Sequence, residues 1–311
     1  MRSSRLAMHR IASIVGLVCL CHAVLAQPPK RRETNFVVKQ SDMQAFMKKM
    51  GAEAKGRVGV AAAIVETGES IAYAGTERFP MQSVYKLPIA MATLAAIDAG
   101  TIRRQKPITV GTGDYVGPKQ HSPLRDQHPS GATVSIDELL RYAVSESDGS
   151  ASDVLLRLVG GASSVQSYLR TIGVTGVMVR NTERELGSAD SVQYANWATP
   201  VEMVSLLRQL QLGRGLSDAS RTYLLKLMTD TATGPNRLKG QLPPGTLVAH
   251  KTGTSMTVDG KTAATNDVGL ITLPSGKHLA IAVFVSDARA DQATRERVIA
   301  QITKQLWNRW Q

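Results

Sequence analysis

The stretch from Phe79 to Met91 contains a serine and a lysine three residues apart, Ser83 and Lys86, at the start of an apolar run. If a helix begins near Ser83, this spacing puts the hydroxyl and the amine on one face, one turn apart. A serine hydroxyl is a weak nucleophile at neutral pH and needs a base within hydrogen-bond reach. A lysine shielded by apolar neighbours can serve as that base. Backbone N–H groups at a helix start can also stabilise developing negative charge.

By itself this spacing predicts little, because it arises by chance about once in a chain of this size. A surface serine and lysine on a helix would explain it equally well. Two further motifs change that balance. Ser147-Asp148-Gly149 lies between two expected helices, and Lys251-Thr252-Gly253-Thr254 lies at the end of an expected strand. All three motifs in order and in suitable contexts are far less probable by chance than the first alone, which favours a serine enzyme.

The elements that must position these motifs follow from the apolar patterns. Strands are expected near both ends of the chain, at 58–65, 70–75, 246–250, 268–273 and 279–285. Helices are expected at 42–54, 83–99, 135–143, 148–159, 163–171, 200–212, 216–229 and 293–310, with Pro88 as a local kink and Gly100 as a C-cap. Residues 101–133 and 181–198 are expected to be mostly loop.

This order of elements predicts an α/β (α+β) fold. One antiparallel five-stranded sheet flanked by helices is built from both termini, and an all-α domain is inserted into it. The expected α/β domain comprises 27–80 and 228–311, and the all-α domain comprises 81–227, with the active site at their interface.

The first 26 residues have the pattern of a secretory signal peptide. Arg2, Arg5 and Arg10 precede an apolar stretch, and cleavage is expected near Ala26, which implies an exported, periplasmic protein. An uncleaved membrane anchor is the alternative. The two cysteines, at positions 19 and 21, lie within this segment, so the mature chain has no disulfide and no cysteine metal site.

Composition narrows the function classes. The chain has 311 residues, of which 43% are hydrophobic and 20% charged, and a net charge of +12, which excludes a disordered chain. The basic residues are scattered and aromatic residues make up 5%, so a nucleic-acid partner is not expected. No membrane span is expected after the signal, and the six histidines show no metal-ligand spacing. A monomer without cofactors is the default expectation.

The three motifs together resemble those of class A serine β-lactamases, and the resemblance covers essentially the whole mature chain. Gln193-Tyr194-Ala195-Asn196-Trp197 is similar to a segment of the PER and VEB subgroup of extended-spectrum enzymes. The resemblance implies the β-lactamase/transpeptidase-like fold. It also implies hydrolysis of the lactam amide of penicillins and cephalosporins, including oxyimino-cephalosporins, without a cofactor.

The resemblance also implies roles for the motif residues. Ser83 would attack the lactam carbonyl, and the N–H groups of Ser83 and Thr254 would form the oxyanion hole. Lys86 would take the proton directly or through water and a carboxylate, and Ser147 would protonate the departing nitrogen. The substrate-binding residues would be Lys251, Thr252, Thr254, Arg237, Ser255, His121 and Gly149. Of these, Arg237 could equally be a surface loop cation, and His121 is expected at the cleft edge.

A lactamase must also activate water against the acyl-enzyme. Thr182-Glu183-Arg184-Glu185-Leu186-Gly187 resembles the family's Glu-x-x-Leu-Asn segment, which assigns the base to Glu183. The alternatives are that Glu183 is a solvated loop carboxylate or that Glu185 is the base.

The chain departs from the family pattern at several positions. Gly149 and Gly187 each stand where the family usually has asparagine, and Arg184 replaces a proline, so a trans peptide bond is expected there. Asn181 and Asn196 replace an Arg–Asp pair that closes the loop around Glu183. A weaker closure, open to bulky oxyimino groups, is therefore expected.

Two other functions use the same motifs. A D-Ala-D-Ala peptidase or penicillin-binding protein would need Ser83, Lys86 and Lys251 but not Glu183. A β-lactam sensor would stay acylated and would normally need a membrane span for signalling.

Overall fold

The computed structural model describes residues 41–311, which pack into one compact unit. The expected signal peptide, its cleavage near Ala26, the two cysteines and the polar segment up to residue 40 lie outside the described residues. Within residues 41–311, no helix is long and apolar enough to cross a membrane.

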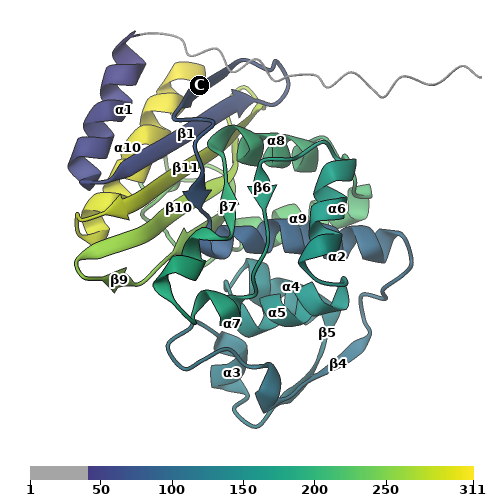
Figure 1. The fold of residues 1–311 in the computed structure, drawn as a ribbon. Coiled ribbons are helices and arrows are strands. Elements are labelled where there is room, and N and C mark those ends of the chain that lie inside the picture. Colours follow the sequence, from purple (N-terminus) through teal and green to yellow (C-terminus); the bar gives the residue numbers. More distant parts are fainter. Residues whose placement is uncertain (1–40) are drawn as a thin grey trace, which may run out of the picture. The chain divides into compact units, whose positions relative to one another are not determined.

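An antiparallel sheet joins the two ends of the described chain. Its strands are β1 (Arg57–Ile64), β2 (Ser70–Tyr73), β8 (Val248–Thr254), β9 (Thr257–Val258), β10 (Lys261–Thr272) and β11 (His278–Ala288). They are ordered β2-β1-β11-β10-β8, and the short β9 pairs with β10. The expected antiparallel sheet built from both termini and flanked by helices is therefore confirmed, with the short β9 as a strand additional to the expected five (Figure 1). The domain boundaries near 80 and 228 remain a prediction.

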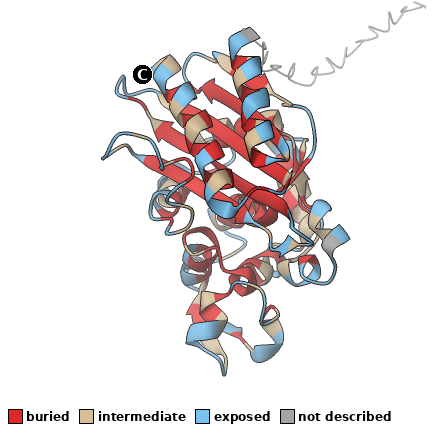
Figure 2. Cartoon of the chain, turned by 90° about the vertical axis from the view of Figure 1, so that its left-hand side faces the viewer, coloured by how far each residue is buried: buried red, intermediate tan, exposed pale blue. Residues whose placement is uncertain are grey.

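Both faces of this sheet are buried. Along β11 the larger side chains of Leu279, Ile281 and Val283 enter one core, whereas Ala280 and Ala282 enter the other. The first core is covered by α1 (Ser41–Ala54) and α10 (Gln292–Trp310), which lie across the buried strands with their exposed residues outward (Figure 2). Because a strand covered on both faces tends to be apolar at successive positions, β1 and β11 appear as long apolar runs in the sequence.

The remaining helices lie between β3 (Phe79–Pro80) and β8 and form the second core. In chain order they are η1 (Gln82–Tyr85), α2 (Lys86–Asp98), η2 (Thr112–Asp114), α3 (Pro123–Gln127), α4 (Ile136–Val144), α5 (Gly149–Leu158), α6 (Ala162–Thr171), α7 (Glu183–Leu186), η3 (Asp190–Tyr194), α8 (Pro200–Gln211) and α9 (Asp218–Thr229). Short strands β6 (Val177–Met178) and β7 (Trp197–Ala198) pair beside β3, and β4 (Pro107–Val110) pairs with β5 (Ala132–Ser135).

Three local expectations differ from the structure. Ser83 lies in the 3₁₀ helix η1, and α2 begins only at Lys86. Pro88 therefore falls in the first turn of α2, where a missing N–H costs no intrahelical bond, so the kink expected there has no cause. The segment 101–133 is mostly loop, as expected, although β4 and the start of β5 form a small sheet and α3 lies between them. The strand containing the Lys-Thr-Gly motif runs on to Thr254.

Candidate active site

Ser83 is held where the end of β8 meets η1. The buried Asn266 of β10 donates from Nδ2 to the carbonyl oxygens of Pro80 (2.8 Å) and Met81 (3.1 Å), just before the serine. On β8, a Cβ at Gly253 would overlap the carbonyl oxygen of Met81, so the glycine allows the two backbones to approach. The sequence thus brings Ser83 beside the Lys-Thr-Gly strand.

Lys86 connects three parts of the site. Its side chain is 1% exposed, and Nζ donates to Ser83 Oγ at 2.8 Å and to the carbonyl oxygen of Ser147 at 2.8 Å. Its third partner is the carboxylate of Glu183, with Nζ and Oε2 3.0 Å apart. One buried cation therefore contacts the expected nucleophile and the expected deacylating base.

The turn at Ser147 is fixed by its neighbour Asp148. That carboxylate is fully buried, caps α5 by accepting from the N–H of Ala151 at 2.8 Å, and accepts from the N–H of Leu124 at 2.6 Å. Ser147 has φ of +61°, a strained value for a residue with a side chain. This conformation presents its carbonyl oxygen to Lys86 and its hydroxyl to Lys251.

Lys251 is fully buried on β8. Nζ donates to Ser147 Oγ at 2.8 Å and to the carbonyl oxygen of Thr252 at 3.0 Å. Burial, and then the positive charge of Lys86, lower the pKa of Lys251 well below its ordinary value. The structure thus joins the three sequence motifs in one chain of contacts through Ser83, Lys86, Ser147 and Lys251.

Glu183 is the first residue of the short helix α7 and points into this site. Oε2 accepts from the hydroxyl of Tyr85 at 2.9 Å and pairs with Lys86, and the side chain is 13% exposed. It is therefore not a solvated loop carboxylate. The alternative base, Glu185, instead completes the capping box of α7 and accepts from the N–H of Thr182 at 2.8 Å, which lowers its pKa.

Asp153 on α5 holds the first turn of α7. Its Oδ1 accepts from the N–H of Glu183 at 2.6 Å, and its Oδ2 accepts from the N–H of Arg184 at 3.0 Å. Burial raises the pKa of Asp153 to about 6, against the lowering effect of these two bonds. Asp153 therefore stabilises the start of α7 through these hydrogen bonds, while burial of its ionised carboxylate is unfavourable.

This raised pKa predicts a pH-dependent stability. The folded protein binds the Asp153 proton more tightly than the unfolded chain does. The contribution of this proton to the free energy of unfolding is therefore complete below pH about 4 and decreases as the pH rises through about 6. Relative to Asp153→Asn, the wild-type free energy of unfolding should decrease by at most about 3 kcal/mol between pH 4 and 7. Urea unfolding of the wild type and of Asp153→Asn between pH 4 and 7 measures the two free energies of unfolding. The prediction would be contradicted if the wild-type value minus the variant value stayed constant or increased with pH.

The loop around Glu183 is closed at its neck by Asn196. This side chain is fully buried, accepts through Oδ1 from the N–H groups of Arg180 (2.7 Å) and Asn181 (2.9 Å), and donates to the carbonyl oxygen of Asn181 at 2.9 Å. Arg184 adds hydrogen bonds of 2.6 Å to the carbonyl oxygens of Gly113 and Tyr115. A neutral amide and an arginine thus close the loop in place of an Arg–Asp pair.

Arg237 is neither a surface cation nor an open ligand. It is 3% exposed, pairs with Glu296 at 3.2 Å, and donates to the carbonyl oxygen of Asn266 at 3.0 Å. The surface-loop alternative is therefore wrong. Its Nη2 donates to Thr254 Oγ1 at 2.8 Å, so its charge lies directly behind an exposed hydroxyl at the end of β8.

The other expected binding residues lie around the same cleft. The hydroxyl of Thr252 is bonded to that of Thr233 at 2.6 Å, and Ser255 Oγ accepts from the N–H of Ala264 at 3.0 Å. His121 is exposed, and its Nε2 lies 2.9 Å from the carbonyl oxygen of Glu146. Thr252 is buried and Ser255 is half-buried, whereas Thr254, whose hydroxyl accepts from Arg237, is exposed to solvent.

The absence of a side chain at position 149 has a steric reason. A Cβ there would lie 2.6 Å from Cγ of Glu183 and 3.2 Å from the carbonyl oxygen of His121, which already accepts from the N–H of Gly149 at 3.0 Å. With Glu183 in its present position, the asparagine usual in the family does not fit.

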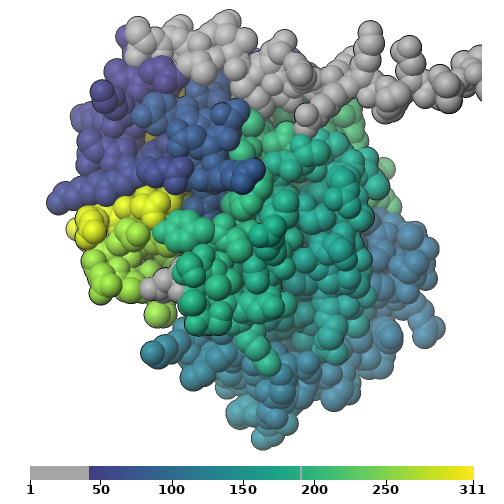
Figure 3. Space-filling view, in the orientation of Figure 1, coloured from purple at the N-terminus to yellow at the C-terminus, as the bar shows by residue number. Residues whose placement is uncertain are grey.

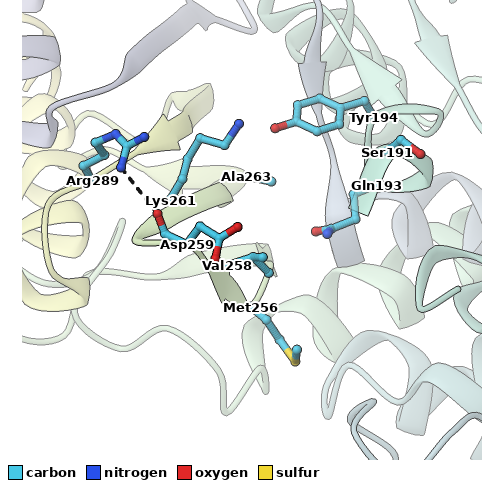
Figure 4. A pocket seen from close by; sticks show the side chains of 9 residues that line it. All are labelled: Ser191, Gln193, Tyr194, Met256, Val258, Asp259, Lys261, Ala263 and Arg289. Carbon is cyan, nitrogen blue, oxygen red and sulfur yellow. Dashed lines mark hydrogen bonds between the residues drawn. The ribbon is translucent and has the colours of Figure 1, made fainter. Parts of the chain in front are cut away.

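A cavity of about 470 Å³ opens between η3 and the β9–β10 hairpin. The residues that line it are Ser191, Gln193, Tyr194, Met256, Val258, Asp259, Lys261, Ala263 and Arg289 (Figure 4). The green segment that contains η3 faces the yellow-green hairpin on the surface (Figure 3). Tyr194 donates to Asp287 at 2.5 Å, and Gln193 accepts from Gln82, the residue before Ser83, at 2.9 Å. One lining residue, Gln193, thus contacts the residue before Ser83, although Ser83 itself does not line the cavity.

Tyr85 and Asp153, which contact Glu183 directly, were missed by sequence reasoning. Tyr85 stands inside the Ser-x-x-Lys spacing, and Asp153 lies on α5, four residues beyond Gly149, but neither position predicts a contact with a loop residue far along the chain. Within the described part of the chain, no group of three or more His, Cys, Asp or Glu side chains is placed to hold a metal ion.

Comparisons with known proteins agree with this site. The sequence model described as "Beta-lactamase enzyme family" matches residues 40–310. β-Lactamase VEB-1 of Pseudomonas aeruginosa is 42% identical over 254 residues, which cover 81% of this chain and 85% of VEB-1. Extended-spectrum β-lactamase PER-1 of the same organism is 39% identical over 250 residues, which cover 80% of this chain and 81% of PER-1.

Solved structures give the same result. A β-lactamase from Chitinophaga pinensis DSM 2588 matches with a TM-score of 0.84 at 42% identity, covering 87% of this chain and 100% of that chain. TLA-1 extended-spectrum β-lactamase matches with a TM-score of 0.83 at 43% identity, covering 86% of this chain and 97% of the TLA-1 chain. The fold and the three motifs define a serine enzyme of the β-lactamase/transpeptidase-like type. Within it, this chain belongs to the beta-lactamase enzyme family, as a class A enzyme.

Proposed function

We propose that this enzyme opens the lactam amide of penicillins and cephalosporins through an acyl-enzyme on Ser83, and that water activated by Glu183 then hydrolyses this intermediate. The observation that carries the proposal is the position of Lys86 Nζ, 2.8 Å from Ser83 Oγ and 3.0 Å from Glu183 Oε2. A nucleophile and a base for water, connected by one buried cation, supply both half-reactions.

The first half-reaction forms the acyl-enzyme. Ser83 Oγ bonds to the lactam carbonyl carbon while its proton passes either to the neutral amine of Lys86, which becomes an ammonium, or through water to the carboxylate of Glu183. The N–H groups of Ser83 and Thr254 would stabilise the resulting oxyanion. The carbon–nitrogen bond then breaks, and the nitrogen receives a proton from Ser147, whose hydroxyl contacts Lys251.

The second half-reaction releases the product. Glu183 takes a proton from water, the hydroxide attacks the Ser83 ester, and the ester bond breaks as the serine oxygen regains a proton. The carboxylate common to penicillins and cephalosporins would lie at the end of β8. Lys251 supplies positive charge there, Thr254 supplies an exposed hydroxyl, and the buried Arg237 stands behind that hydroxyl.

We extend the substrate range to oxyimino-cephalosporins. Two observations support this: the relatives PER-1 and TLA-1 are named extended-spectrum enzymes, and a cavity of about 470 Å³ is lined by Gln193, whose side chain bonds to that of Gln82, the residue before Ser83. A peptidase or a permanently acylated sensor is less well supported, because neither requires a carboxylate such as Glu183 within reach of Lys86.

We also propose that the enzyme is exported to the periplasm and cleaved near Ala26. The arginine-rich start and apolar stretch of the first 26 residues support this. A mature N-terminus at Gln27, read by mass spectrometry of the secreted protein, would agree with it.

The function is tested with nitrocefin, a chromogenic cephalosporin. The wild-type protein should turn it over continuously, and Ser83→Ala should reduce turnover by about 10⁴-fold or more, because the nucleophile is lost. Intact-protein mass spectrometry should show a transient adduct only when Ser83 is present. Release of D-alanine from a D-Ala-D-Ala peptide without nitrocefin turnover would contradict the proposal and favour the peptidase.

A further inference from the structure

The space beside Gly187 is occupied by another residue. A Cβ at Gly187 would lie 2.6 Å from Cδ and 2.7 Å from Nε2 of Gln120, which belongs to the loop between η2 and α3. The Gln120 amide thus fills the place of any side chain at position 187. The absence of a side chain at Gly187 and the presence of Gln120 are therefore two parts of one arrangement.

Gln120 bonds the backbone of the catalytic loop. Its Nε2 donates to the carbonyl oxygen of Glu183, and its Oε1 accepts from the N–H of Gly117 at 3.0 Å. Arg125 fixes this loop by donating to the carbonyl oxygens of Gly117 (2.7 Å) and Gln120 (3.1 Å). The amide therefore connects a braced loop to the residue that carries the expected base.

The short helix α7 needs such support. Four residues are too few to form a stable helix alone, because the cost of nucleation is not recovered by so few hydrogen bonds. Asp153 holds the N–H groups at its start, and Gln120 holds the carbonyl oxygen of its first residue. The backbone of Glu183 is thus held at its N–H by Asp153 and at its carbonyl oxygen by Gln120.

We propose that Gln120 is a positioning residue for Glu183, and that it replaces a side chain at position 187 in holding the loop that carries the base. Gln120 acts through the backbone of Glu183 and not on the substrate. The inference rests on the proposed function, because it assumes that Glu183 activates the deacylating water.

The test is a double-mutant cycle of Gln120→Ala and Gly187→Asn, followed by stopped-flow separation of acylation and deacylation with nitrocefin. Gln120→Ala should slow deacylation by about 10- to 100-fold, because a displaced Glu183 carboxylate is poorly aligned with the hydrolytic water. Acylation should change by less than about threefold if Lys86 takes the Ser83 proton directly. Gly187→Asn alone should slow deacylation similarly, because its side chain displaces Gln120.

The double variant should deacylate faster than either single variant, because the asparagine can enter the space that Gln120→Ala vacates. Lys119→Ala, at the exposed neighbouring position, is the matched control and should keep wild-type rates. The inference is overturned if deacylation is unchanged in Gln120→Ala, if acylation and deacylation fall together with the melting temperature, or if the two substitutions act additively. A wild-type chain that shows no turnover would overturn the proposed function itself.

Discussion

Glu183→Gln should convert sustained nitrocefin turnover into a single stoichiometric burst. The glutamine keeps the size of the side chain beside Tyr85 and Lys86 but cannot accept a proton from water, so the Ser83 ester persists. Loss of a general base slows its step by about 10²- to 10⁴-fold. A time course with enzyme and nitrocefin at comparable concentrations measures the burst, and mass spectrometry detects the adduct.

Glu185→Gln is the matched control for this experiment. It changes the neighbouring carboxylate, whose oxygen caps α7 through Thr182, and should keep turnover while lowering stability by about 1 kcal/mol through the weakened cap. Turnover that survives Glu183→Gln but is lost in Glu185→Gln would move the base to Glu185. A burst without turnover in the wild type would instead mean a penicillin-binding or sensor protein.

Lys86→Met should slow acylation by about 10²- to 10⁴-fold, the range expected when a positioned proton acceptor is removed. Methionine has a similar length and suits the 1%-exposed position, so the fold should be retained, with Glu183 losing its ion pair. Single-turnover stopped-flow measurements give the acylation rate, and a thermal melt checks the fold. Lys106→Met, at an exposed lysine, is the control and should leave the rate unchanged.

The two variants together separate the two routes for the Ser83 proton. If Lys86 accepts it directly, Glu183→Gln should acylate at nearly the wild-type rate while Lys86→Met does not. If the proton passes through water to Glu183, acylation should decrease in both variants. Acylation at the wild-type rate in Lys86→Met would contradict any role for this lysine in the first half-reaction.

Much of the fold was predictable from local pattern. The helices expected at 135–143 and 200–212 form, because their caps depend on residues three or four apart. Ser135 and Glu138 form a capping box at the start of α4, and Thr199 caps α8 with Pro200 at its first position. Gly100 follows α2 with φ of +72°, the left-handed conformation that favours glycine. The long strands were underestimated only at their polar ends, as at Lys251 to Thr254, where the motif residues interrupt the apolar run.

The sequence by itself determined the serine, lysine and threonine motifs and the sheet built from both ends, because motif spacing and apolar periodicity are local properties. Only the tertiary structure decided how Glu183 is held. The hydroxyl of Tyr85, the carboxylate of Asp153 and the amide of Gln120 converge on it from η1, α5 and a distant loop. Likewise, Arg237 became a buried support of Thr254 because packing brought Glu296 beside it. Such contacts join residues between 17 and 98 positions apart, and no local pattern specifies them.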